Sequence, residues 1–341
     1  MAFSAREGDL IENFKRVIFD VKGLIHPEDR IIAYPRFIPS PSGNRKRKDT
    51  SYRKVYSLSE RFKFLEQTFP HYLVHDTVFD ETLCSVPVCD VKKHYKPAEK
   101  LRQLRSSRRL DALETVVLQL TESLREKANI LWDAIGVSGS ILVGLHTADS
   151  DIDPVIYGSE NCRKVHDALK SLLKDEPSQF KPYDREELEV LFDFRSKDTV
   201  MSFEDFVRTE SRKALQGKFL DKDYFVRFVK DWDEVSEKYG DVRYVNIGYA
   251  RIKAMVVDDS KSIFTPCSYK LSNVQILEGP KAELIEEIAS FRGRFCEQAR
   301  EGEEIIAQGK VEHVIDNLQE REYSRLLLGN NPSDFMMLAE A

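Results

Sequence analysis

The stretch on which the fold and the chemistry depend is residues 136–158, which read GVSGSILVGLHTADSDIDPVIYG. Near its start, Gly139 and Ser140 follow a short apolar run and open what we expect to be one or two helical turns. Further along come Asp151 and Asp153. Residues two apart in a strand point to the same face of a sheet. The pattern therefore predicts two carboxylates side by side.

Two carboxylates on one face repel each other unless a cation lies between them. Mg²⁺ takes oxygen ligands and keeps coordination positions for phosphate oxygens. Free N–H groups at a glycine-containing helix start bind anions, and the Ser140 hydroxyl adds a donor. Together these features suit attack on a nucleoside triphosphate. The alternative is a solvated turn, because Asp149, Ser150 and Asp151 all favour turns, but it leaves Gly139 and Ser140 unexplained.

The stretch resembles the signature of the DNA polymerase beta-like nucleotidyltransferase superfamily, in which a Gly-Ser pair precedes Asp-x-Asp in a strand. Gly139, Ser140, Asp151 and Asp153 match this signature one by one. The next residue is usually aliphatic and here is Pro154, so we expect that strand to lie at a sheet edge or to bulge.

The resemblance implies a mixed sheet with helices, Mg²⁺ held by Asp151 and Asp153, and an NTP such as ATP held at Gly139 and Ser140. The superfamily usually carries a third carboxylate on the next strand, which completes the metal site and takes the proton of the attacking hydroxyl. Residues 219–229 are aromatic and β-branched, as expected of a strand. Asp223 is the best-placed candidate there, and Asp258 is the alternative.

Composition describes a soluble globular protein. The 341 residues are 41% hydrophobic and 32% charged with a net charge of −6, which suffices for two or three domains and does not indicate a general nucleic-acid binder. We find no apolar run long enough to span a membrane and no signal peptide. Five cysteines, an odd number, favour a reducing cytoplasm.

We expect an α+β fold in three parts: an N-terminal α/β domain in residues 1–100, a nucleotidyltransferase core with a helical insertion in 101–238, and a β-rich domain in 239–341. Apolar spacing predicts helices at 9–15, 58–69, 110–131, 162–173, 184–194, 202–215 and 281–287. Strands are predicted at 17–21, 30–34, 135–137, 242–257, 263–271, 274–277, 304–308, 311–315 and 323–328, and a loop at 37–49. The many short strands near the end indicate a small barrel or sandwich.

Four further groups of residues are candidates for binding, and two of them are not basic segments. Cys84, Cys89 and His94 are spaced five apart, with His71 and His75 nearby, but the spacing is unusual for zinc and buried thiols are the alternative. The mixture of Phe and Arg at 291–295 suits either base stacking or a barrel core.

A local excess of positive charge lies upstream of the predicted core. Residues 92–109 contain eight Lys or Arg residues, and we expect Arg102, Arg105 and Arg109 to share one helix face. This patch could hold a polyanion such as RNA, and a solvated linker helix is the alternative. The basic run at 45–48 is a second candidate for phosphate contact, or a solvated loop tip.

The whole chain also resembles an archaeal group of predicted nucleotidyltransferases, on the runs 250–254 and 263–267. We therefore expect an enzyme that moves a nucleoside monophosphate to a hydroxyl acceptor. Two other classes remain open: a nucleotide-binding sensor without turnover, and an RNA-binding adaptor. The sequence leaves the acceptor, the nucleotide preference and the oligomeric state undefined.

Overall fold

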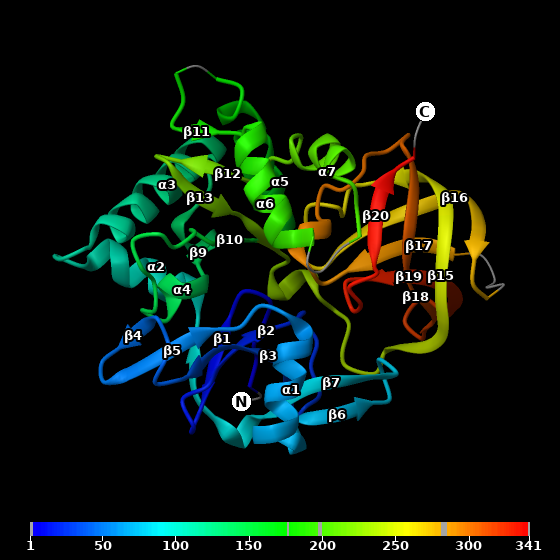
Figure 1. The fold of residues 1–341 in the computed structure, drawn as a ribbon, viewed down its shortest axis with the longest axis horizontal. Helices are drawn as coiled ribbons and strands as arrows, with labels where there is room; N and C mark the ends of the chain where they lie inside the picture. Colours follow the sequence, from blue (N-terminus) through cyan, green and yellow to red (C-terminus); the bar gives the residue numbers. More distant parts are fainter. Residues whose placement is uncertain (1–2, 176, 197–199, 281–284, 340–341) are drawn as a thin grey trace. The chain divides into compact units, whose positions relative to one another are not determined.

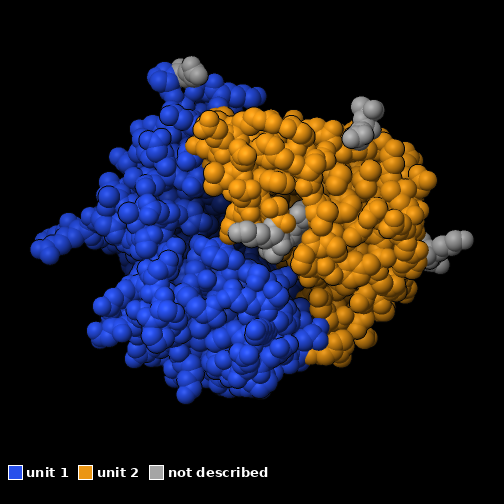
Figure 2. All heavy atoms as spheres, in the orientation of Figure 1, with its two compact units in different colours: residues 1–74, 82–181, 215–236 blue, residues 75–81, 182–214, 237–341 orange. Residues whose placement is uncertain are grey.

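A computed structural model of the chain describes residues 3–175, 177–196, 200–280 and 285–339. They form two compact units, coloured separately in Figure 2. Unit 1 comprises residues 1–74, 82–181 and 215–236, and unit 2 comprises residues 75–81, 182–214 and 237–341. The N-terminal segment and most of the predicted core thus share one unit. No helix in the described ranges is long and apolar enough to cross a lipid bilayer.

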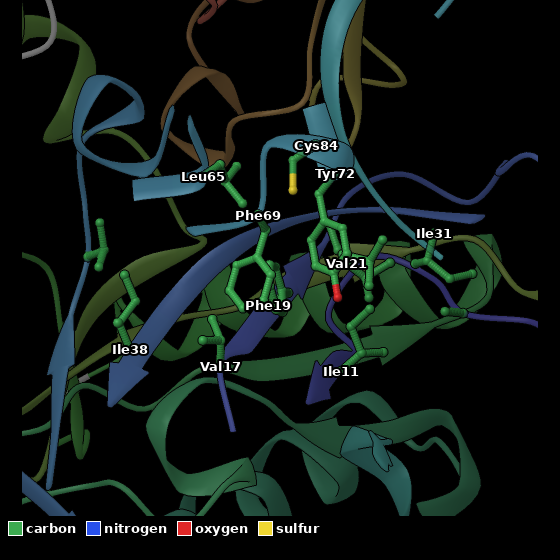
Figure 3. Close-up of a cluster of buried hydrophobic side chains, with 14 residues drawn as sticks. Ile11, Val17, Phe19, Val21, Ile31, Ile38, Leu65, Phe69, Tyr72 and Cys84 are labelled. Atoms are coloured by element: carbon green, nitrogen blue, oxygen red, sulfur yellow. The ribbon is translucent and has the colours of Figure 1, made fainter. Parts of the chain in front are cut away.

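The N-terminal part of unit 1 is a sheet with strand order β4-β5-β3-β2-β1-β8, and β7 pairs with β3 and β6 (Figure 1). Its elements are β1 (Leu10–Asn13), β2 (Ile18–Val21), β3 (Arg30–Pro39), β4 (Arg45–Arg47), β5 (Thr50–Lys54), α1 (Leu58–Thr68), β6 (Leu73–Asp76), β7 (Glu81–Pro87) and β8 (Val91–Tyr95). Buried apolar side chains from β1, β2, β3 and α1 form its core, among them Ile11, Phe19, Ile31 and Leu65 (Figure 3).

Two predictions for this part are wrong. Residues 9–15 contain strand β1 and the turn after it, not a helix. Leu10 and Ile11 are both buried and pair with β2 and β8, and a short apolar run does not distinguish a strand from a helix. The predicted loop at 37–49 contains the end of β3 and all of β4, which pairs with β5 as a tight hairpin. The helix predicted at 58–69 is confirmed as α1.

The rest of unit 1 contains the stretch 136–158, with Gly139, Ser140 and the two aspartates. Its elements are α2 (Pro97–Ser106), α3 (Ala112–Ala128), β9 (Ile135–Val137), α4 (Gly139–Leu142), β10 (Pro154–Tyr157), α5 (Ser159–Leu172), β11 (Phe180–Lys181), β12 (Gln216–Phe219), β13 (Lys222–Phe225) and β14 (Arg227–Val229). Strand β10 lies between β14, to which it is parallel, and β9, to which it is antiparallel. The expected edge or bulge at Pro154 is therefore wrong, and the proline is accommodated as the first residue of a central strand.

Helix α3 shows why the apolar stripe predicted a helix. Leu113, Val117, Leu120 and Leu124 are buried along one side, and a capping box between Asp111 and Glu114 closes its N-terminus. The helix ends before the predicted residue 131, since Asn129 adopts a left-handed conformation.

Unit 2 contains helices α6 (Arg185–Arg195) and α7 (Phe203–Glu210) and a barrel of β15 (Val242–Asp258), β16 (Cys267–Glu278), β17 (Ile285–Ser290), β18 (Glu304–Asp316) and β19 (Arg321–Leu328), with β20 (Phe335–Leu338) paired to β18. The order β15-β16-β17-β19-β18 closes through a β15–β18 pairing, which confirms the predicted small barrel. The helix predicted at 281–287 is wrong where it is described, because β17 begins at Ile285, and residues 281–284 lie outside the described ranges. Phe295 is buried, which fits a barrel core rather than base stacking.

The tip of the β6–β7 hairpin belongs to unit 2. The Tyr244 N–H donates to the Val78 carbonyl at 2.8 Å, so the tip covers part of the edge of β15. The Lys310 ammonium, 4% exposed, pairs with Glu81 of the tip and with Glu312 of its own strand. Seven residues distant in sequence thus complete the surface of the barrel.

Candidate active site

Asp151 and Asp153 flank Ile152 just before β10. Ile152 is fully buried and forms a parallel bridge with Tyr224. Because side chains alternate along an extended chain, the two carboxylates share the opposite face. The Asp151 carboxylate is 43% exposed, so this face is open to a ligand.

The Gly139 backbone lies directly against the Asp153 carboxylate. A β-carbon built on Gly139 would stand 1.9 Å from Asp153 Oδ2, and the glycine has a φ of +63°. The Ser138 N–H also donates to the Asp153 carbonyl at 2.8 Å. Only glycine fits this position without displacing the carboxylate. The structure therefore joins the two halves of the motif.

Ser140 lies in α4, which is a single turn. Its side chain is 1% exposed, and its Oγ has no hydrogen-bond partner among the described residues. Buried hydroxyl groups almost always have a partner. A polar ligand atom at this point would satisfy the hydroxyl.

The strand register places Asp223 beside Asp151. The Ile152 N–H donates to the Asp223 carbonyl at 2.9 Å, and the Phe225 N–H donates to the Ile152 carbonyl at 3.0 Å. Ile152 is thus aligned with Tyr224, and one step back in each strand Asp151 is aligned with Asp223 on the carboxylate face. The Asp223 side chain is exposed and lies 3.8 Å from Lys218.

Asp258, the alternative third carboxylate, lies in unit 2 at the end of β15. Its carboxylate accepts a hydrogen bond from the Ser260 N–H at 2.8 Å, and the hydrogen bonds from Ser260 lower its pKa. This geometry is that of a turn-stabilising aspartate.

Basic side chains from the N-terminal strands approach the aspartate pair, and the motif gave no indication of them. The Lys54 ammonium, 9% exposed on its side chain, lies 3.6 Å from Asp151 Oδ1. Burial and the neighbouring Asp151 charge raise the pKa of Asp153 to about 6, although the charges of Lys54, Arg227 and Arg36 oppose the shift. The positive charges around the carboxylate pair therefore offset only part of the effect that burial has on the pKa of Asp153.

Arg227 connects the pair to buried carboxylates of the N-terminal segment. It hydrogen-bonds to Glu7, whose side chain is fully buried, and lies 3.8 Å from Asp20. Burial acts to raise the pKa of Asp20, but the charges of Lys22, Arg227 and Arg36 hold it well below its ordinary value. In the sequence, the signal for this network is Asp20, a charged residue inside the apolar run 17–21.

The candidate cysteine and histidine ligands do not assemble into a metal site among the described residues. Cys84 is buried, and burial raises the pKa of its thiol well above the ordinary value, whereas Cys89 is exposed. His94 Nε2 lies 2.8 Å from Asp9. In the described part of the chain, three ligand-type groups come close together only at Asp111, Glu114 and His146, where the acids form the capping box of α3.

Arg102, Arg105 and Arg109 do not share one helix face, which corrects the prediction. Helix α2 ends at Ser106, so Arg109 lies beyond it. The Arg105 guanidinium lies 3.8 Å from the centre of the Trp132 ring, and Arg102 lies 3.6 Å from Asp133. The remaining lysines of the segment lie elsewhere, on β8 and at the start of α2.

Comparison with known proteins gives one similarity over the whole chain. The chain is 33% identical over 341 residues to an archaeal protein of Methanocaldococcus jannaschii described as "Uncharacterized protein MJ1086", and the match covers 96% of each chain. No family model matches the chain, and no solved structure matches it.

Proposed function

We propose that this chain, which belongs to the same family as the Methanocaldococcus jannaschii protein MJ1086, is a nucleotidyltransferase. It transfers a nucleoside monophosphate from an NTP to a hydroxyl acceptor and releases pyrophosphate. The observation that carries the proposal is the contact between Gly139 and Asp153 on a face that also holds Asp151 and Asp223. A solvated turn does not account for this arrangement.

The residues present fit Mg²⁺. The donor set consists of carboxylate oxygens of Asp151 and Asp153, which are the ligands that this cation prefers. The raised pKa of Asp153 indicates a carboxylate short of positive charge, which a divalent cation would supply. Bound there, Mg²⁺ would neutralise charge on the phosphates during the displacement.

The protein's own groups position the substrates. The Ser140 hydroxyl is a donor for a phosphate oxygen, and the missing side chain of Gly139 lets the Asp153 carboxylate lie against the backbone next to that hydroxyl. Arg36 and Arg227 add positive charge behind Asp153. Asp223, exposed beside Asp151, orients the acceptor hydroxyl or takes its proton.

The direct test is a transfer assay. The protein is incubated with α-labelled NTPs, Mg²⁺ and, in separate reactions, pooled cellular RNA, small molecules and proteins. The proposal expects label on one acceptor pool, with none from Asp151→Asn or Asp153→Asn. Transfer that persists in both variants would overturn it.

A second candidate, a nucleotide-binding sensor without turnover, is favoured by one observation. The strand register aligns Asp153 with Phe225 rather than with a carboxylate, and Lys54 lies next to Asp151. The sensor predicts NTP binding that requires both aspartates, with no labelled product from any pool. An RNA-binding adaptor instead predicts RNA binding that survives loss of Asp151.

A further inference from the structure

A pocket of about 540 Å³ lies in unit 1, lined by the β4–β5 hairpin, β8, α2 and the end of α4. Its volume is in the range of ordinary ligand sites. Three carboxylates and seven cations line it. The carboxylates are Glu12, Asp49 and Glu99, and the cations are Arg16, Arg47, Lys48, Lys92, Lys93, Lys96 and Lys100. The structure thus brings together the two basic segments that lie far apart in the sequence.

Part of this positive charge is not compensated. Arg47 pairs with Glu12 at 2.8 Å, and Lys100 pairs with Glu114 at 3.1 Å. Within the described ranges, Lys48, Lys92 and Lys93 take part in no ion pair. The excess is therefore local, in a chain whose net charge is −6.

Two of the cations occupy unfavourable backbone conformations. Arg16 has a φ of 64° and Lys48 a φ of 52°. Glycine or asparagine is the usual residue in this left-handed region, and long side chains there are uncommon. A glycine at position 48 in the β4–β5 turn would adopt this conformation without strain, so the fold does not require the lysine there.

The pocket adjoins the candidate active site without including it. Helix α4 has Gly139, against Asp153, at one end and Leu142, in the pocket lining, at the other, a rise of roughly 5 Å. Strand β5 runs from Thr50 in the lining to Lys54 beside Asp151, roughly 13 Å at the usual rise.

We propose that this pocket binds phosphate groups of the acceptor, at a distance that lets the acceptor's hydroxyl reach the aspartate pair. This inference rests on the proposed function, because it assigns the pocket to the acceptor. The NTP belongs at the aspartates and Gly139, at the opposite end of α4. The seven cations of the lining outnumber its three carboxylates by four charges, which is more than a single phosphate group requires, so the ligand carries several phosphates. Both an RNA segment and a small polyphosphorylated molecule have this chemistry.

Equilibrium binding without NTP or Mg²⁺ tests the pocket separately from catalysis. The probes are a labelled RNA octamer and inorganic tripolyphosphate, each titrated at several salt concentrations. The variants are Lys92→Ala combined with Lys93→Ala, and Lys48→Gly, which relieves the backbone and should not impair folding. The matched control is Arg102→Ala, which removes a 66% exposed cation from α2 outside the pocket.

For RNA, each lost phosphate contact should reduce the log–log salt slope by about 0.7, so the double variant should bind roughly 25-fold more weakly at 0.1 M salt. Lys48→Gly should weaken binding in the same direction, and Arg102→Ala should leave it unchanged. RNA binding with these losses supports an RNA acceptor. Tripolyphosphate binding with these losses, and no binding of RNA, supports a small phosphorylated acceptor.

If neither probe binds, or if Arg102→Ala weakens binding as much as the pocket variants do, the proposal that this pocket binds phosphate groups is wrong. Binding that needs the pocket lysines, in a protein that labels no acceptor in the transfer assay, would leave the pocket's affinity for phosphates standing but remove the proposed function. The two failures are therefore distinguishable.

Discussion

Gly139 and Asp153 are in contact so close that a methyl group on the glycine would stand 1.9 Å from the carboxylate oxygen. Gly139→Ala should therefore displace Asp153 and abolish metal-dependent NTP binding. Gly144→Ala is the matched control, because Gly144 has a similar φ of +65° but no atom within 4 Å of the added carbon. In both variants, strain from the left-handed backbone conformation should destabilise the folded state by about 1–2 kcal/mol. Titration with a fluorescent NTP and Mg²⁺ should separate them, and equal loss in both would contradict this account.

Asp153→Asn should stabilise the metal-free protein at neutral pH while it abolishes transfer. The folded pKa of about 6 lies above the ordinary value of 3.8, so the folded state holds the proton more tightly. Stability from this group is present below pH 4 and is lost as the pH rises to 6, by up to about 3 kcal/mol. Thermal unfolding with chelator should give a higher Tm than the parent at pH 7 and no difference at pH 4. A lower Tm at pH 7 would show that Asp153 supports the fold.

Asp223→Asn should reduce transfer and leave NTP binding nearly unchanged, because Asp223 is exposed beside Asp151 and is assigned to the acceptor hydroxyl. Asp258→Asn should change neither quantity. Single-turnover rates and NTP affinities for both variants decide between the two carboxylates. A loss of transfer only in Asp258→Asn would reverse the assignment.

Ser140→Ala should leave stability unchanged or slightly raised, since the buried hydroxyl has no partner in the described part of the chain. Its removal should weaken NTP binding by about 1–3 kcal/mol, the contribution of a hydrogen bond to a charged group. Urea unfolding and NTP titration measure the two effects independently. A large loss of stability with unchanged NTP affinity would make the serine structural.

His26 should make the protein sensitive to mild acid. Burial lowers its pKa to about 4, although the bond to the Ala5 carbonyl opposes the shift. The Ile32 N–H donates to its Nδ1 at 3.2 Å, a bond that only the neutral ring accepts. Because the folded pKa lies below the unfolded value of 6.5, stability is lost as the pH falls from about 6.5 to 4, by up to about 3 kcal/mol.

His26→Leu should flatten this dependence. Urea midpoints at pH 7 and pH 5 provide the check, and an unchanged difference between them in the variant would assign the sensitivity to other groups.

The sequence predicted much of the motif because its information is local. A glycine, a serine and two alternating aspartates mark a turn and a strand, and the stripe of α3 needs only helical spacing. The sequence could not predict that Lys54 and Arg36 lie near the aspartates, because their positions depend on how strands distant in the sequence pack. The prediction of a helix at β1 is wrong for the same reason: pairing with β2 and β8 decides the structure of a segment whose sequence pattern is ambiguous by itself.

The pocket shows the same limit in another form. From the sequence, residues 45–48 and 92–109 are each either a candidate for phosphate contact or a solvated segment, and only their common lining of one cavity gives them a shared role. Helix α2 then divides the second segment, with Lys96 and Lys100 on the pocket and Arg105 against Trp132. Spacing along a predicted helix could not show that the helix stops at Ser106.

The hairpin tip at residues 75–81, which belongs to the same unit as the barrel, limits how the gene can recombine. With residues 182–214 it makes the chain pass between the two units five times, at 74/75, 81/82, 181/182, 214/215 and 236/237. A recombination break point anywhere in the coding sequence therefore leaves at least one unit without one of its segments. The two units cannot be exchanged as separate cassettes, in keeping with a relative that matches over 96% of both chains.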